Sequence, residues 1–178
     1  MSLFNKSIYT ILSLTRNKNT LNIVNSIGNI DNYNLIVPNL YLGNINAAND
    51  IDFLKKNKIE AIINCTKEEP FNSYFDDKLK LRLYINDSKE DNNIEKFKSD
   101  IINTINFIED ALLLNKAVYV HCYWGLMRSA TVVAAYLIKR YSMTHLEAIS
   151  FVKEQRPKAL SSIYNFNEIL IFVENSTK

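Results

Sequence analysis

The chain has 178 residues, of which 47% are hydrophobic and 22% are charged. This composition excludes a disordered or fibrous protein, and the length is that of one globular domain. Twenty-one Lys and Arg residues against 19 Asp and Glu leave a net charge of +2, so bulk charge predicts neither a nucleic-acid nor a membrane partner. The two cysteines, Cys65 and Cys122, are too few for a disulfide scaffold, and no CxxC or HxxxH spacing predicts a metal site.

Residues 1–32 differ in pattern from the rest of the chain. Phe4, Ile8, Ile11 and Leu12 recur at helical spacing, which predicts a short amphipathic helix followed by a linker. Two arrangements are open for this helix, because it can pack back onto the domain or dock onto a second copy of the chain as a homodimer. No apolar run is long enough for a secretory signal or a membrane span, so we expect a cytoplasmic protein.

From residue 33 to residue 175 the hydrophobic pattern is regular, and predicted strands alternate with predicted helices. Apolar runs predict strands at residues 35–37, 40–42, 61–65, 79–85 and 117–120. Helical spacing and capping signals predict helices at residues 47–56, 92–112, 129–141, 144–156 and 165–174. This alternation predicts an α/β fold with a central, mostly parallel sheet of about five strands and helices on both faces.

The stretch from Val118 to Ala130 holds the residues from which a chemistry can be predicted. It contains a strand, a loop with Cys122, Gly125 and Arg128, and the start of a helix, in that order. Backbone N–H groups of such a loop converge on one point, and the helix dipole adds positive potential there, so the geometry suits a phosphate. The same field favours the nucleophilic thiolate of Cys122. Arg128 can hold two phosphate oxygens at once, and Gly125 lets the backbone turn inward.

These residues form a Cys-x5-Arg motif, preceded by His121 and followed by Ser129. The motif resembles the phosphate-binding loop of the cysteine-dependent protein tyrosine phosphatases. The chain length and the segments 38–43 and 61–66 are similar to those of the small dual specificity phosphatases, and the resemblance extends over about residues 35–157. It implies that residues 33–175 form a catalytic domain with the fold of those enzymes.

The resemblance also implies a reaction in two steps. Cys122 attacks phosphorus to form a phosphocysteine intermediate, which water then hydrolyses without a metal or a cofactor. Ser129 matches the hydroxyl that eases the departure of the sulfur in the second step, and His121 matches the residue that orders the loop. The residues between the cysteine and the arginine are expected to bind the phosphate together with Arg128: Tyr123, Trp124, Gly125, Leu126 and Met127.

Two loop positions differ from the usual pattern of the small dual specificity enzymes. Trp124 stands where that pattern has Ala, and Met127 stands where it has Ser or Gly. Their bulk predicts a narrowed pocket, with a restricted range of substrates or a protein that binds phosphate without turnover. Alternatively, Trp124 lies at the rim of the pocket and its indole stacks on a phosphotyrosine ring.

The leaving oxygen of a phosphoester needs a proton, and Asp87 is the candidate general acid. It follows a predicted strand and precedes the long helix at residues 92–112, which is where the resembling family keeps its acid. Glu90 and Asp91 are nearby competitors for the same role.

We therefore expect a protein phosphatase that acts on phosphotyrosine, and on phosphoserine or phosphothreonine, in phosphorylated protein substrates. Three other functions remain open. An RNA 5′-triphosphatase is disfavoured because relatives with that activity generally lack the acid at Asp87. A phosphoinositide phosphatase is disfavoured because residues 123–127 contain no lysine. A pseudophosphatase that only binds phosphoproteins would normally have lost Cys122 or Arg128.

The second cysteine, Cys65, is expected in the core at the end of a strand. That strand should run close to the loop that contains Cys122. A disulfide between Cys65 and Cys122, formed on oxidation and protecting the nucleophile, is therefore a hypothesis.

Overall fold

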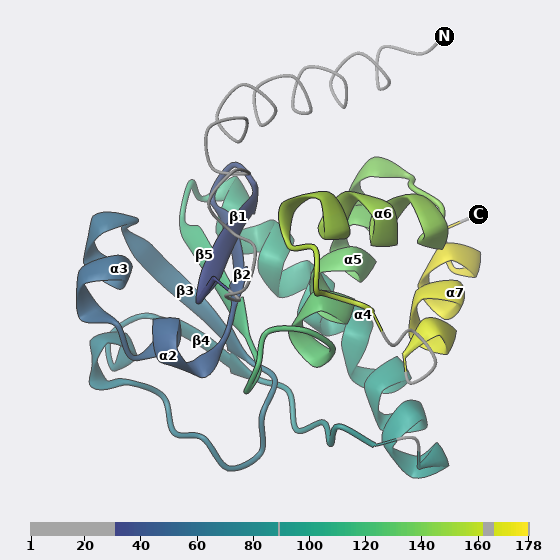
Figure 1. The fold of residues 1–178 in the computed structure, drawn as a ribbon, viewed down its shortest axis with the longest axis horizontal. Coiled ribbons are helices and arrows are strands. Elements are labelled where there is room, and N and C mark those ends of the chain that lie inside the picture. The colour runs from purple at the N-terminus through teal and green to yellow at the C-terminus, as the bar shows by residue number, and fades with distance from the viewer. Residues whose placement is uncertain (1–30, 89, 162–165, 178) are drawn as a thin grey trace, which may run out of the picture. The chain divides into compact units, whose positions relative to one another are not determined.

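The computed structural model describes residues 31–88, 90–161 and 166–177. Within this part of the chain, five strands form one sheet in the order β1-β2-β5-β3-β4 (Figure 1). The strands are β1 (Tyr33–Val37), β2 (Leu40–Gly43), β3 (Ile59–Asn64), β4 (Leu79–Arg82) and β5 (Ala117–His121). β1 and β2 are antiparallel, whereas β2 with β5, β5 with β3, and β3 with β4 are parallel. The predicted mostly parallel sheet of about five strands is confirmed.

Helices cover both faces of the sheet, as the alternation of elements predicted (Figure 1). One face carries α2 (Ile45–Ala48) and α3 (Ile51–Lys56), and a short 3-10 helix, η2 (Ser73–Phe75), lies beside β3. The other face carries α4 (Asp91–Leu113), α5 (Arg128–Tyr141), α6 (His145–Gln155) and α7 (Asn167–Asn175). The predicted α/β fold is therefore confirmed.

The central strand β5 is buried on both sides because its side chains alternate between the two layers. Tyr119 packs with Phe53 and Ala47 beneath α2 and α3, and its ring meets that of Phe53 edge to face at 5.2 Å. Val118 and Val120 are fully buried on the opposite face, which α4 and α5 cover. This two-sided burial fixes the carboxyl end of β5, where the predicted loop begins.

Two predicted elements differ from the structure. The helix expected at residues 47–56 is two short helices, because Asn44 and Asp50 each cap a separate one through a side-chain oxygen. The strand expected at residues 79–85 ends at Arg82, because its partner β3 ends at Asn64. The last bond of this pairing runs from the Leu83 N–H to the Asn64 carbonyl, and the chain then continues as a segment without regular structure.

All of these elements belong to one unit, Asn32–Lys178. Residues 1–30 lie outside the described residues, so the amphipathic helix expected at residues 1–32 and the domain boundary at residue 32 stay predictions. No helix in the described ranges is both long and apolar enough to cross a membrane.

Candidate active site

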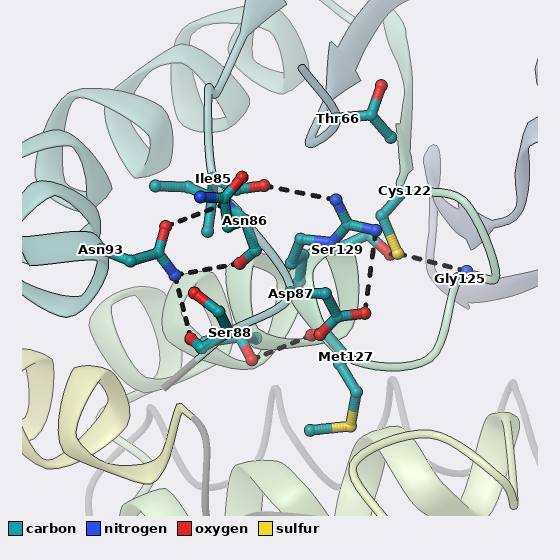
Figure 2. A network of polar contacts seen from close by, with 12 residues as sticks. Thr66, Ile85, Asn86, Asp87, Ser88, Asn93, Cys122, Gly125, Met127 and Ser129 are labelled. Atoms are coloured by element: carbon teal, nitrogen blue, oxygen red, sulfur yellow. Dashed lines mark hydrogen bonds and ion pairs between the residues drawn. The ribbon is translucent and has the colours of Figure 1, made fainter. Parts of the chain in front are cut away.

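Cys122 directly follows β5, and its side chain is buried at the start of the loop. Its Sγ accepts one hydrogen bond from the Gly125 N–H and one from the Ser129 hydroxyl, each at 3.2 Å (Figure 2). Ser129 is fully buried in the first turn of α5. Both donors stabilise negative charge on the sulfur, and the helix that begins at Arg128 adds the positive end of its dipole. These contacts suit a thiolate nucleophile.

The carbonyl groups of the loop at residues 123–127 all accept hydrogen bonds from residues outside the loop. Each of the five carbonyl oxygens accepts a hydrogen bond, and the donors are Ile45 N to Tyr123 (3.2 Å), Arg156 Nη2 to Trp124 (3.3 Å), Arg156 Nε to Gly125 (2.8 Å), Leu160 N to Leu126 (2.9 Å) and Thr131 N to Met127 (2.8 Å). Since the C=O of one residue and the N–H of the next point in opposite directions across a trans peptide, the outward carbonyls of residues 123–127 leave the N–H groups of residues 124–128 facing into the loop. A ring of inward N–H groups can bind an anion.

Gly125 occupies a position that only glycine can take. Its φ is +69°, and a Cβ there would lie 2.4 Å from the carbonyl carbon and oxygen of Gly43. Gly43 is equally crowded, because a Cβ at that residue would lie 2.3 Å from the Asn32 oxygen and 2.4 Å from the Tyr119 hydroxyl. The loop therefore packs against the end of β2 through two glycines, of which the sequence analysis had singled out Gly125.

Arg128 is the first residue of α5, and its guanidinium is nearly buried. Nη1 donates to the Ile85 carbonyl oxygen at 3.2 Å, and Nη2 lies 3.7 Å from the Asp87 carboxylate. Nε is buried and has no hydrogen-bond partner among the described residues. A buried donor without a hydrogen-bond partner lowers the stability of the fold by about 1–3 kcal/mol. This N–H is therefore suited to donate a hydrogen bond to an oxygen of a bound anion.

Asp87 lies on the segment between β4 and α4, and 43% of its side chain is exposed. Of the three carboxylates considered in the sequence, Asp87 forms an ion pair with Arg128 at 3.7 Å. Glu90 is exposed at the N-cap of α4, and the side chain of Asp91 is outside the described part. Asp87 is thus placed beside the loop, with its carboxylate accessible to a bound substrate.

His121 is the last residue of β5 and is almost completely buried. Its ring lies parallel to that of Tyr119 at a centroid distance of 5.7 Å. Burial lowers the pKa of His121 to about 3, and the nearby charges of Arg82 and Arg128 act in the same direction. The imidazole is therefore neutral at neutral pH, and the carbonyl of the same residue accepts from the Cys65 N–H at 2.8 Å.

The bulky side chains of the loop are not buried within it. Trp124 is 61% exposed and Tyr123 is 45% exposed, and their rings meet edge to face at 5.1 Å. Leu126 and Met127 are half-buried. Both aromatic side chains are thus on the surface of the loop, and a position of Trp124 at the rim of the pocket stays a prediction.

Cys65 is buried immediately after β3, the strand next to β5. Burial raises its pKa well above the usual value, the nearby Cys122 raises it further, and Arg128 opposes both effects. Both cysteines are free thiols. The hypothesised disulfide between them stays a prediction, with the two residues on adjacent strand ends.

Two further residues contact the site and were not predicted from the sequence. Arg156, which is 2% exposed, donates to two loop carbonyls and also to the Asn34 side chain at 2.6 Å. Asn93, in the first turn of α4, bonds to the backbone on both sides of Asp87. An arginine at a helix end and an asparagine in a chain rich in asparagine give no local signal of such contacts.

Among the described residues, no group of three His, Cys, Asp or Glu side chains could hold a metal ion.

Comparison with known proteins gives consistent matches. A family model described as "Dual specificity phosphatase, catalytic domain" matches residues 40–176. The chain is 36% identical over 143 residues to human dual specificity protein phosphatase 16, a match that covers 80% of this chain and 21% of that protein. It is 34% identical over 125 residues to dual specificity protein phosphatase 1 of Arabidopsis thaliana, covering 70% of this chain and 61% of that protein. The chain thus spans about a fifth of the length of the human relative.

Solved structures share the same fold. The crystal structure of DUSP15 superposes with a TM-score of 0.71 at 29% identity, covering 82% of this chain and 90% of that one. Human DUSP28 gives a TM-score of 0.73 at 25% identity, covering 82% of this chain and 94% of that one. These structures share the α/β architecture of this chain, in which Cys122 follows the central strand.

Proposed function

The chain belongs to the dual specificity phosphatase family, and on that premise we propose that it is a cysteine-dependent protein phosphatase. It hydrolyses phosphotyrosine, and phosphoserine or phosphothreonine, through a phosphocysteine intermediate. One observation carries the proposal: the Cys122 sulfur, with its two hydrogen-bond donors, lies in a loop whose arginine keeps a buried Nε–H free of partners among the described residues. A phosphate dianion satisfies the charge and the donors of this site together.

In the first step, the Cys122 thiolate attacks phosphorus, and the S–P bond forms as the P–O bond to the leaving group breaks. The inward N–H groups of residues 124–128 and the Arg128 guanidinium bind the phosphoryl oxygens, where negative charge is concentrated. Asp87, in its protonated form, gives its proton to the leaving oxygen. The products are a free hydroxyl on the substrate and phosphocysteine.

In the second step, water attacks the phosphocysteine and the S–P bond breaks. Asp87, now ionised, takes the proton of the attacking water, and inorganic phosphate leaves. The departing sulfur carries a negative charge, which the Ser129 hydroxyl stabilises at 3.2 Å. The neutral His121 supports the site by packing and not by charge, since its ring is buried against Tyr119.

We further propose the setting in which this enzyme works. Its partners are phosphorylated protein substrates, its place is the cytoplasm, and a second copy of the chain docks through the helix expected at residues 1–32. The amphipathic pattern of Phe4, Ile8 and Ile11 supports the last of these proposals.

The function is tested with an aryl phosphate, a phosphotyrosine peptide, a phosphothreonine peptide and 5′-triphosphorylated RNA. Cys122→Ser is expected to abolish turnover of every substrate that the wild type hydrolyses while leaving the fold intact, because the hydroxyl is a far weaker nucleophile. Asp87→Ala is expected to lower kcat/KM for the peptides about 100-fold, and kcat/KM for an aryl phosphate whose leaving group needs no proton much less. Steady-state kinetics on each substrate measures both effects, with circular dichroism as the control for folding.

The same experiment separates the alternatives. Turnover confined to the triphosphorylated RNA identifies an RNA 5′-triphosphatase. Binding of phosphopeptides without any turnover identifies a pseudophosphatase. Either result overturns the proposed phosphatase activity on proteins, and equal peptide rates for Asp87→Ala and the wild type overturn the role of Asp87.

A further inference from the structure

The segment that contains Asp87 has no regular secondary structure, and one buried side chain bonds to its backbone on both sides of Asp87. Asn93 is buried in the first turn of α4, with 5% of its surface exposed. Its Oδ1 accepts from the Asn86 N–H at 2.8 Å, and its Nδ2 donates to the Asn86 carbonyl at 2.9 Å and to the Ser88 carbonyl at 3.1 Å (Figure 2). These bonds join the residues immediately before and after Asp87.

The three contacts use both kinds of hydrogen-bonding group in the Asn93 amide. The paired bonds to the N–H and C=O of Asn86 repeat the two-bond pairing of opposite residues in an antiparallel sheet. The third bond, to Ser88, fixes the far side of Asp87 and so limits rotation of the intervening backbone. From the other side of the segment, Arg128 donates to the Ile85 carbonyl at 3.2 Å.

Between Asn86 and Ser88, the Asp87 side chain forms an ion pair and not a hydrogen bond. Its carboxylate lies 3.7 Å from the Arg128 guanidinium, which is beyond hydrogen-bond distance, and the side chain is 43% exposed. The backbone of the segment is therefore held while the carboxyl group stays free to meet a leaving oxygen. This separation of a fixed backbone from a free side chain is what a proton donor needs, because proton transfer requires heavy atoms about 2.6–3.2 Å apart.

We propose that Asn93 is a positioning residue for the general acid, holding the backbone on both sides of Asp87 so that its carboxyl group lies over the phosphate-binding loop. This inference rests on the proposed phosphatase function. In the described contacts Asn93 bonds to the Asp87 segment and not to the loop, so it acts on the reaction through Asp87. Removing it should slow the step that needs a proton and leave phosphate binding unchanged.

The test is Asn93→Ala, with Asn92→Ala as the matched control, since Asn92 is an exposed asparagine in the same helical turn. Each protein is assayed on a series of aryl phosphates whose leaving groups range from strongly acidic phenols to phenol itself. For Asn93→Ala, we expect kcat/KM on the poorest leaving group to fall about 10- to 100-fold while kcat/KM on the best one stays near wild type, because kcat/KM reports the step in which the leaving oxygen is protonated. For Asn92→Ala we expect wild-type values throughout.

A double substitution distinguishes positioning of Asp87 from a general effect on the site. In the Asp87→Asn background, which has no acid to position, Asn93→Ala is expected to cause no further loss. Asn93→Asp keeps the acceptor for the Asn86 N–H but loses both donors, and it is expected to show the same dependence on the leaving group if its thermal unfolding shows a folded protein. This second variant keeps the test available if Asn93→Ala fails to fold.

Three results would overturn the inference. One is an equal loss of kcat/KM for all leaving groups in both Asn93 variants, which indicates a structural role alone. Another is a further loss in the Asp87→Asn background as large as in the wild type. The third is an absence of leaving-group dependence in Asp87→Asn itself, since no acid would then be positioned. Failure of the proposed function has a different signature, namely turnover that survives Cys122→Ser.

Discussion

His121 illustrates how burial sets the charge of an individual residue at this site. Its neighbours in sequence indicated a place beside the nucleophile, and the structure adds that the ring is buried against Tyr119 with its pKa lowered to about 3. Nδ1 has no hydrogen-bond partner among the described residues, and the effect of burial exceeds that of a backbone hydrogen bond at Cys122, which favours the charged ring. The neutral form is therefore part of the folded structure, and protonation opposes folding.

This gives a prediction for the pH dependence of stability. The unfolded chain binds a proton at His121 below about pH 6.5, whereas the folded chain binds it only near pH 3, so the free energy of unfolding falls as the pH is lowered between these values. The expected slope from this group is about 1.4 kcal/mol per pH unit. Urea unfolding of the wild type and His121→Gln at several pH values between 4 and 7 measures it. Identical slopes in the two proteins would show that His121 does not titrate in this way.

At the scale of residues, the sequence was sufficient for side chains that lie close together in the chain. Cys122, Gly125, Arg128 and Ser129 fall within eight positions, and their spacing predicted a loop that the structure forms around the sulfur. Arg156 contacts the same loop from 31 positions beyond Gly125, through the packing of α6. Contacts of that kind depend on how helices pack, and no local sequence pattern predicts them.

At the scale of elements, the ends of β3 and β5 bring the two cysteines to adjacent positions. Asn64 is paired with His121, and the next bond runs from the Cys65 N–H to the His121 carbonyl. The alternation of strands and helices was enough to predict this parallel sheet, because hydrophobic runs of strand length are a local signal. The split between α2 and α3 was missed because side-chain caps at Asn44 and Asp50 interrupt an otherwise helical pattern.

This adjacency underlies a redox prediction. Peroxide oxidises the Cys122 thiolate to a sulfenic acid, and the Cys65 thiol condenses with it to give a disulfide and water. A thiol reagent should then restore most of the activity of the wild type but little of that of Cys65→Ala, whose sulfenic acid is oxidised further. Because burial raises the pKa of Cys65, we expect the disulfide to form faster as the pH rises. Equal recovery in both proteins would argue against the disulfide.

At the scale of the whole molecule, a single sheet carries the site at the carboxyl end of its central strand, and the helices on its two faces supply the supporting contacts. The loop is bonded from α2 by Ile45, and from the end of α6 and the segment after it by Arg156 and Leu160. All of these contacts lie within the unit Asn32–Lys178. The predicted helix before it lies outside the described residues.

The proposed homodimer is a prediction for the full chain. Ile8→Asp together with Ile11→Asp places two charges on the apolar face of the helix expected at residues 1–32, and should convert a dimer to a monomer. Sedimentation equilibrium measures the mass, with Lys6→Asp as a control on the polar side of the same segment. A wild-type chain that sediments as a monomer at all accessible concentrations would rule out the dimer.

The outward carbonyls of residues 123–127 have a consequence for how enzymes of this design can diverge. In the proposed mechanism the peptide units bind the oxyanion, so the side chains at those positions take no part in the chemistry and are available for substrate selection. Tyr123 and Trp124, both exposed, occupy that freed surface here. New substrate preferences can therefore evolve through substitutions at these two positions, without any change at Cys122 or Arg128.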